Sequence, residues 1–186
     1  MHAFPSGTLA LDFVGTLRVR RQPVPLEQLS SPMLLDAWFV ESGLLDEEPA
    51  STEGDLRAAV KLRESIYSLV KARLTGAPLP ADAVAVVNRQ ASGAPELIQL
   101  GFGGRALRSG SAAQGLASIA RQSVEIIGGD DGALLRECGR SMCTQVYVDR
   151  SRGRRREWCA MRTCGNRAKA SAYRARHRGT VEKAGV

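Results

Sequence analysis

Histidine and aromatic residues are scarce in this chain, and their scarcity limits its chemistry. The sequence has 2 histidines, His2 and His177, and 5% aromatic residues. A serine or cysteine hydrolase needs a histidine base beside its nucleophile, and these two positions offer almost none. The last third has three aromatic residues, Tyr147, Trp158 and Tyr173, which is little surface for stacking unpaired bases. We therefore expect a protein that is not an enzyme and that does not bind single strands by stacking.

Long apolar runs are also missing. No stretch approaches the roughly 18 uninterrupted apolar residues that a membrane span requires. The run over 3–17 is broken by Pro5 and Asp12 and follows no basic region, which is unlike a signal peptide. We expect no membrane partner and a cytoplasmic location.

Cysteine is absent from the first two thirds of the chain, which argues against the disulfide framework of a secreted protein. The 4 cysteines are Cys138, Cys143, Cys159 and Cys164. They form two pairs of the same C-x4-C spacing, and four thiolates from two short knuckles can surround Zn²⁺ and leave no open position for water. The spacing predicts one structural zinc ion. A redox dithiol pair or an iron–sulfur cluster is the alternative.

Charge is segregated along the sequence. Residues 1–149 hold 14 Lys and Arg against 17 Asp and Glu, whereas residues 150–186 hold 12 against 2. A neutral body with a basic C-terminal part is typical of a protein that contacts a polyanion. The alternative is a solvated, disordered basic tail.

Apolar periodicity and turn residues predict an α-rich body. The expected elements are a short strand or the start of a helix at 9–14, helices at 32–43, 56–75, 81–91 and 112–127, and two strands within 97–109. The glycines of 101–104 predict a hairpin turn, because no Gly-Lys-Ser/Thr follows as in a phosphate-binding loop. Asp12 lies in an apolar run, so its carboxylate must find donors if it is buried; we expect a structural capping role.

The glycine-rich break after residue 127 predicts a domain boundary, with a body over 1–130 and a zinc finger over 134–180. In the finger, Val146–Val148 predict a strand, and the alanine-rich run after Cys164 predicts a helix that carries this last ligand in its first turn. A knuckle, a hairpin and such a helix define a treble-clef arrangement. The expected fold class is therefore α+β, with an α-rich N-terminal domain, a small antiparallel β element and a small treble-clef-like finger.

The segment WCAMRTCGNRAKASAYRARHR, preceded by VDRSRGRRRE, resembles the CGNR zinc finger of bacterial proteins. LALDFVGTL at 9–17 resembles the start of the ABATE domain that precedes this finger in many members. The resemblance implies that the four cysteines bind zinc and that Gly165, Asn166 and Arg167 are the family signature. It also implies a stress-induced transcription regulator. Members often have Asn where this chain has Gly15, so this chain lacks that polar side chain.

Our hypothesis is that zinc fixes the finger while its basic side chains bind duplex DNA. Arg154, Arg155, Arg156 and Arg162 are expected mainly on the phosphate backbone, and Arg167, Lys169, Arg174 and Arg176 are candidates for base edges. The full set of expected nucleic-acid contacts is Arg152, Arg154, Arg155, Arg156, Arg162, Arg167, Lys169, Arg174, Arg176 and Arg178.

A protein partner is the rival hypothesis. In it, the finger docks on an acidic surface of the transcription or translation machinery, as treble-clef fingers often do. In either case the N-terminal domain is a possible sensor of a small effector, an expectation that rests on two-domain architecture alone.

Overall fold

The computed structural model describes residues 2–181, without the side chains of residue 172 and of residues 175–181. The helices are α1 (Leu9–Val14), α2 (Pro32–Glu41), α3 (Glu53–Thr75), α4 (Ala81–Ala91), α5 (Ala112–Gly128) and α6 (Asn166–Val181), with short helical turns η1 (Asp130–Leu134) and η2 (Met161–Gly165). The strands are β1 (Leu17–Arg18), β2 (Leu26–Glu27), β3 (Leu97–Leu100), β4 (Ala106–Ser109), β5 (Leu135–Glu137) and β6 (Val146–Val148). In the described part of the chain the strands pair as three separate antiparallel hairpins. The structure thus confirms the expected α+β class.

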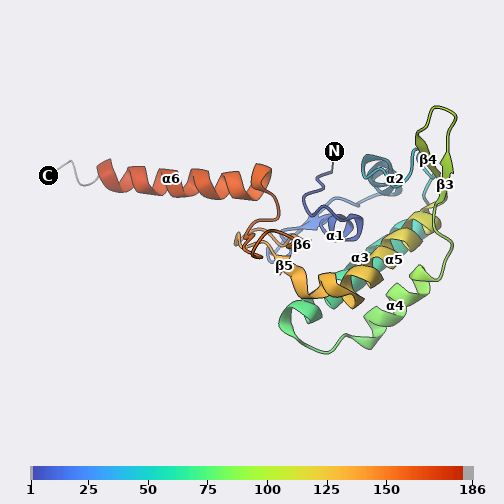
Figure 1. Ribbon diagram of the computed structural model, residues 1–186, viewed down its shortest axis with the longest axis horizontal. Helices are drawn as coiled ribbons and strands as arrows, with labels where there is room; N and C mark the ends of the chain where they lie inside the picture. Colours follow the sequence, from blue (N-terminus) through green and yellow to red (C-terminus); the bar gives the residue numbers. More distant parts are fainter. Residues whose placement is uncertain (1, 182–186) are drawn as a thin grey trace.

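Three long helices, α3, α4 and α5, form the body, and α1 packs against α3 and α5 (Figure 1). Leu62, Ile66 and Val70 repeat at helical spacing on α3 and are buried in the core. An amphipathic stripe of this kind stabilises the fold by removing apolar surface from water. Thr52 and Asp55 cap the start of α3 reciprocally, and Gly76 ends it in the left-handed conformation (φ 70°).

Segment 9–14 forms a helix, so of the two expectations for this segment the strand was wrong. Ala10, Leu11, Phe13 and Val14 are all buried. The Phe13 ring lies edge-on to Trp38 of α2, with the ring centroids 5.1 Å apart. Because α1 is enclosed on every side, its apolar residues show no helical stripe in the sequence, and their alternation imitates a strand.

The other expected helices and strands of the body are present close to their expected bounds, whereas the β1–β2 hairpin was not expected. Ser31 caps α2 by accepting a hydrogen bond from the Leu34 N–H, and α4 has the expected bounds. Strands β3 and β4 are joined by a tight turn, in which the Gly104 N–H donates to the Gly101 carbonyl at 2.9 Å. This hairpin extends from the body with Phe102 fully exposed at its tip (Figure 1). None of the described helices combines the length and the apolar character needed to cross a bilayer.

Asp12 holds the N-terminal segment on α1, which is a structural role as expected. Its buried carboxylate accepts a hydrogen bond from the Ser6 N–H at 2.8 Å. Burial raises the pKa of Asp12 to about 6, against the opposing effect of hydrogen bonds from Ser6 and Gly7.

A buried ion cluster fixes the β1–β2 hairpin to α3. Arg63 is 1% exposed and forms two hydrogen bonds of 2.6 Å with the Glu27 carboxylate, while its Nε lies 2.8 Å from Glu64. Burial would raise the pKa of Glu27, but the Arg63 guanidinium outweighs burial and holds the pKa below its usual value. Arg20, just after β1, pairs with Glu64 at 2.5 Å. The Arg63–Glu27 pair is bidentate, with Arg63 buried and the Glu27 side chain 32% exposed, a geometry in which a guanidinium–carboxylate pair positions the backbone around it.

We predict that Asp12→Asn removes a pH-dependent loss of stability. Between pH 3.8 and about 6 the folded protein keeps the Asp12 proton and the unfolded chain releases it, so this group's contribution to stability falls as pH rises. The variant keeps an acceptor for the Ser6 N–H but cannot ionise. Relative to the parent protein, its free energy of unfolding should therefore rise between pH 4.5 and pH 7.5 by about 2 kcal/mol.

Urea denaturation of both proteins at the two pH values measures this difference. Asp82→Asn, at an exposed carboxylate on α4, is the matched control. A difference between Asp12→Asn and the parent protein that does not change with pH would contradict the prediction.

Candidate metal centre and basic surface

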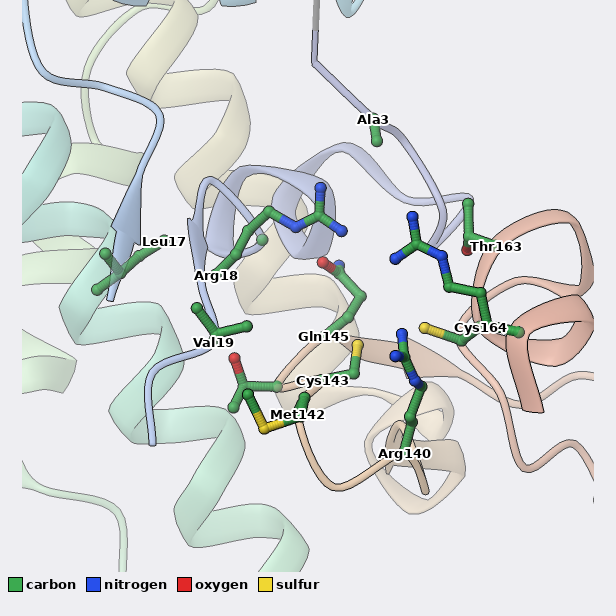
Figure 2. A pocket seen from close by; sticks show the side chains of 13 residues that line it. Ala3, Leu17, Arg18, Val19, Arg140, Met142, Cys143, Gln145, Thr163 and Cys164 are labelled. Atoms are coloured by element: carbon green, nitrogen blue, oxygen red, sulfur yellow. The ribbon is translucent and has the colours of Figure 1, made fainter. Parts of the chain in front are cut away.

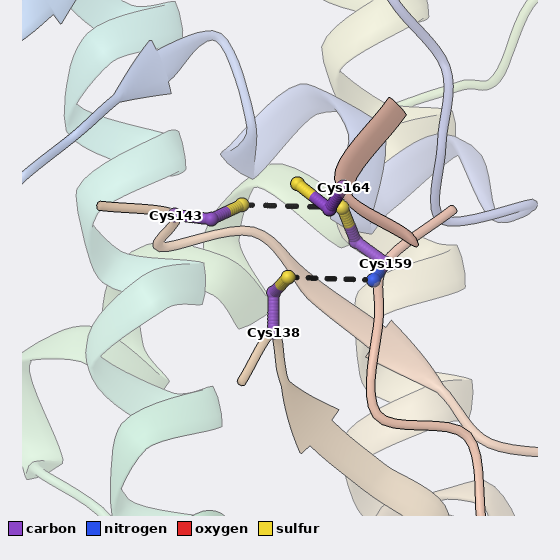
Figure 3. A group of neighbouring side chains, drawn as sticks. All are labelled: Cys138, Cys143, Cys159 and Cys164. Atoms are coloured by element: carbon purple, nitrogen blue, oxygen red, sulfur yellow. Dashed lines mark hydrogen bonds between the residues drawn. The ribbon is translucent and has the colours of Figure 1, made fainter. Parts of the chain in front are cut away.

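The four cysteine sulfurs converge on one point. Their Sγ atoms all lie within 4.8 Å of one another, and none is in a disulfide. The Sγ atoms of Cys143 and Cys159 are 3.9 Å apart (Figure 3). A disulfide has an S–S length of about 2.05 Å, whereas a Zn–S distance of about 2.3 Å gives a tetrahedral edge of about 3.8 Å. The four cysteines are therefore positioned to hold one metal ion.

Each pair of cysteines lies on a separate turn. Cys138 directly follows β5, and its N–H extends the hairpin ladder to the Gln145 carbonyl at 2.9 Å. The Cys143 N–H closes a tight turn on the Arg140 carbonyl at 2.8 Å. Cys159 precedes η2, and Cys164 lies within this π-helical turn, immediately before α6. The hairpin, the two knuckles and the following helix form the expected treble-clef arrangement, except that Cys164 comes just before the α-helix rather than in its first turn.

The electrostatics of the four thiols fit a metal cation. Hydrogen bonds from the Cys143 and Cys159 thiols, and from the backbone N–H groups of Arg140 and Cys159, hold the pKa of Cys138 well below its usual value. The hydrogen bond with Cys138 raises the pKa of Cys143 to about 11 and also raises that of Cys159. Neighbouring thiols can thus stabilise one thiolate, but four anions at this separation require a cation. Cysteine thiolates suit zinc and other soft or borderline metals.

Gly165 allows the second knuckle to pack closely. A Cβ added at this position would lie 2.5 Å from the Met161 Sδ and 3.3 Å from the Trp158 Cδ1. The Gly165 N–H donates to the Ala160 carbonyl at 3.0 Å and closes the π turn. Gly165, which the resemblance marked as part of the family signature, therefore leaves the space inside the knuckle that the Met161 side chain occupies.

Arg156 is committed to contacts within the protein. Its guanidinium stacks on the buried Tyr147 ring at 4.4 Å and donates to the carbonyls of Trp158 (2.8 Å), Pro5 (3.2 Å) and Cys159. Its backbone N–H donates to the Asp149 carboxylate at 3.0 Å. These donors hold the second knuckle in place, and the expected contact of Arg156 with phosphate remains a prediction.

The roles of Tyr147 and Asp149 were not foreseen from the sequence. Tyr147 donates from its hydroxyl to the Arg156 carbonyl at 2.5 Å. Asp149 is fully buried and also accepts from the N–H and hydroxyl of Ser151. In the sequence, the only indication of these roles was the position of Asp149 as an acidic residue at the start of an arginine-rich loop.

Seven further basic residues of the finger are exposed, and none of the seven forms an ion pair among the described residues. The exposed members with described side chains are Arg152, Arg154, Arg155, Arg162, Arg167, Lys169 and Arg174. Among the described residues, Arg150 is the last basic residue in the sequence that forms an ion pair, and its partner is Asp131. The side chains of Arg176 and Arg178 lie outside the described residues, so their expected contacts remain predictions.

The finger shares a core with the body. Leu135, Val146 and Val148 of the β5–β6 hairpin are buried in the same cluster as α1, α3 and α5. The Gln145 amide donates to the Leu11 carbonyl at 3.0 Å, and a Cβ at Gly15 would lie 2.1 Å from the Gln145 Oε1. In this chain the space that a side chain at position 15 would take is therefore filled from the finger by Gln145.

An α-rich body joined to a four-cysteine treble-clef finger defines a two-part, metal-binding protein class. Residues 7–130 match the ABATE family, described as "Putative stress-induced transcription regulator", and residues 135–177 match the CGNR zinc finger. The chain therefore belongs to the ABATE family and carries a CGNR zinc finger after its ABATE domain. No curated protein matches the chain.

We predict that removing the metal destabilises the body as well as the finger. The chain has two tryptophans, Trp38 buried in the body and Trp158 in the finger, so Trp158→Phe leaves Trp38 as the sole tryptophan, whose emission can be excited selectively over that of tyrosine. Because Leu135, Val146 and Val148 belong to the body's core, loss of the metal should lower the midpoint of the Trp38 unfolding transition. Urea unfolding of this variant with bound zinc and after chelation measures the shift. An unchanged Trp38 transition would show that the two parts fold independently.

We predict that Gly165→Ala weakens metal binding through a clash with Met161. Overpacking costs about 1–3 kcal/mol in a close-packed core; because the Met161 side chain is half exposed and can shift, the lower limit applies, a loss of about fivefold in zinc affinity, measured by competition with a chromophoric chelator. Because the clash is with a flexible side chain, Met161→Ala should restore part of the affinity in the double variant. Additive losses in the double variant would contradict this account.

Proposed function

We propose that this protein is a zinc-dependent regulator of transcription that binds duplex DNA through its finger. One zinc ion per chain, held by the four cysteines, would have a purely structural role, because four protein ligands leave no position for a reactive water. On this proposal the protein is not an enzyme, and it works in a reducing cytoplasm where the thiolates persist.

The seven exposed, unpaired cations of the finger carry this proposal. Cations that serve only the fold are commonly neutralised by nearby carboxylates, as Arg20 and Arg63 are in the body. The described finger after Arg150 contains one acidic residue, the exposed Glu157. A dense, uncompensated positive surface is what releases counterions on binding a phosphate backbone.

The position of α6 suits a groove-binding role. The helix extends away from the body with no other element alongside it (Figure 1), and its contacts are concentrated on η2. A helix is about 10–12 Å across, and the major groove of B-DNA is about 12 Å wide. Arg167 and Arg174 are two turns apart on one face of α6, so both can reach base edges when the helix lies in one groove. Arg154 and Arg155, on the loop before the second knuckle, would contact phosphates.

A protein partner is the second candidate, and a specific observation favours it. The β3–β4 hairpin exposes apolar side chains on both strands, including Leu100 at 82% and Leu97 at 52%. Exposed apolar surface of this extent is typical of interaction sites. This surface belongs to the body, so a protein contact there is compatible with DNA binding by the finger.

We predict that charge reversal of Arg154 and Arg155 weakens DNA binding and reduces its salt dependence. Loss of two phosphate contacts should lower the slope of log K against log salt by about 2. Fluorescence anisotropy with a labelled random duplex, over a series of salt concentrations, measures both quantities for the zinc-loaded protein.

Arg57→Glu combined with Lys61→Glu is the matched control, because it makes the same change in net charge at exposed positions of α3. If this control and Arg154→Glu/Arg155→Glu reduce affinity equally, the effect is one of net charge and the finger surface is not the binding site. If the zinc-loaded protein without substitutions does not bind the duplex, the proposed DNA binding is wrong and a protein partner for the finger is favoured.

A further inference from the structure

A cavity of about 340 Å³ lies where the body meets the finger. The body contributes Gly15, β1 and the residue after it, and the finger contributes residues of both knuckles and the start of α6. This volume is within the range of small-molecule sites, about 300–1,000 Å³. The buried side chains of Thr144, Gln145 and Cys164 form part of its lining, so the cavity is deeper than a surface phosphate contact requires.

Three arginines line this cavity: Arg18 from β1, Arg140 from the first knuckle and Arg167 from α6. Figure 2 shows the side chains of Arg18 and Arg140 reaching into the same space. Within the described residues none of the three forms an ion pair or donates a side-chain hydrogen bond, and no carboxylate lines the cavity. Arg18 and Arg167 are exposed and Arg140 is half-buried, so three positive charges from separate segments line one solvent-accessible cavity, an arrangement that attracts an anion.

The cysteine thiolates do not account for this charge. Cys143 and Cys164 line the cavity, and a zinc ion with four thiolates carries a net charge of about −2, which is less than the charge of three guanidinium groups. No described guanidinium donates to a cysteine sulfur; the hydrogen-bond partners of the sulfurs are backbone N–H groups and other thiols.

The backbone beside Arg18 is strained. Val19 has φ 49°, in the left-handed region, where a β-branched residue is a rare outlier that costs about 1–3 kcal/mol. This conformation ends β1 at Arg18 and turns the chain toward the finger, where the Arg20 N–H donates to the Thr144 hydroxyl at 3.3 Å. Strain of this kind is concentrated at ligand sites, where the surrounding structure enforces it.

We propose that this cavity binds a small phosphorylated molecule, with Arg18, Arg140 and Arg167 surrounding its phosphoryl group. A phosphoryl dianion offers several oxygens to the planar donor forks of more than one guanidinium, whereas a single carboxylate is satisfied by one. The half-buried Thr163 hydroxyl, which has no hydrogen-bond partner among the described residues, lines the same cavity as a further donor. The volume left beyond one phosphoryl group accommodates the remainder of a metabolite-sized ligand.

Arg167 connects this site with α6. A ligand that engages Arg167 removes it from the helix surface available to a base edge, so ligand and duplex would compete for this side chain. That consequence rests on the proposed DNA binding, whereas the site itself does not.

Isothermal titration of the zinc-loaded full chain with pyrophosphate, at constant ionic strength and without DNA, tests the site. We expect saturable binding of one pyrophosphate per chain. Arg18→Met and Arg140→Met should each weaken it at least tenfold, and Arg18→Lys should weaken it less, because it keeps the charge. Arg152→Met, at an exposed cation away from the cavity, should leave it unchanged. Zinc content, measured on every variant, should stay the same.

Three results would overturn the proposal. If pyrophosphate does not bind saturably, Arg18, Arg140 and Arg167 serve only to balance the negative charge of the thiolates. An equal loss in Arg152→Met would indicate diffuse attraction to the basic surface. If Arg18→Met and Arg140→Met weaken a labelled duplex while pyrophosphate does not compete with it, the phosphate recognised is that of the DNA backbone. Because the titration contains no DNA, failure of the proposed DNA binding leaves its outcome unaffected.

Discussion

Burial of the β5–β6 hairpin in the body's core determines where every other part of the finger lies. Leu135, Val146 and Val148 take part in the same apolar cluster as α1, α3 and α5. The first knuckle closes the far end of this short hairpin, so the body's core positions Cys138 and Cys143. The second knuckle then has to meet a fixed pair of sulfurs, and Arg156 holds it there by joining Tyr147, Trp158 and the N-terminal segment at Pro5.

The same packing separates the arginines of the C-terminal third into classes with different physical roles. Arg150 is paired with Asp131 and Arg156 is bound by backbone carbonyls. Arg154 and Arg155 have no protein partner among the described residues, and Arg167 faces a cavity shared with the body. A count of positive charge treats these residues as equivalent, whereas their partners decide whether each one stabilises the knuckle or remains available to a ligand.

Features encoded within one short segment could be predicted from the sequence, and those created by distant segments could not. The bounds of α4 and the caps of α2 and α3 follow from local signals such as Ser31 and Gly76, and the cysteine spacing indicated the metal centre. The helical state of α1 depends on enclosure by the rest of the fold, which leaves no periodicity to detect. Arg18 and Arg140 meet only through tertiary packing, so nothing near either residue indicates a shared cavity.

Helix α6 has a mechanical consequence. Its 16 residues span about 24 Å at 1.5 Å per residue, and its contacts are concentrated at its first turn, on η2. A rotation of about 10° at Cys164 would therefore displace the far end by about 4 Å, more than the spacing of neighbouring base pairs along DNA, about 3.4 Å. The geometry of the metal centre and of the adjoining cavity therefore determines how accurately α6 could be positioned in a DNA groove.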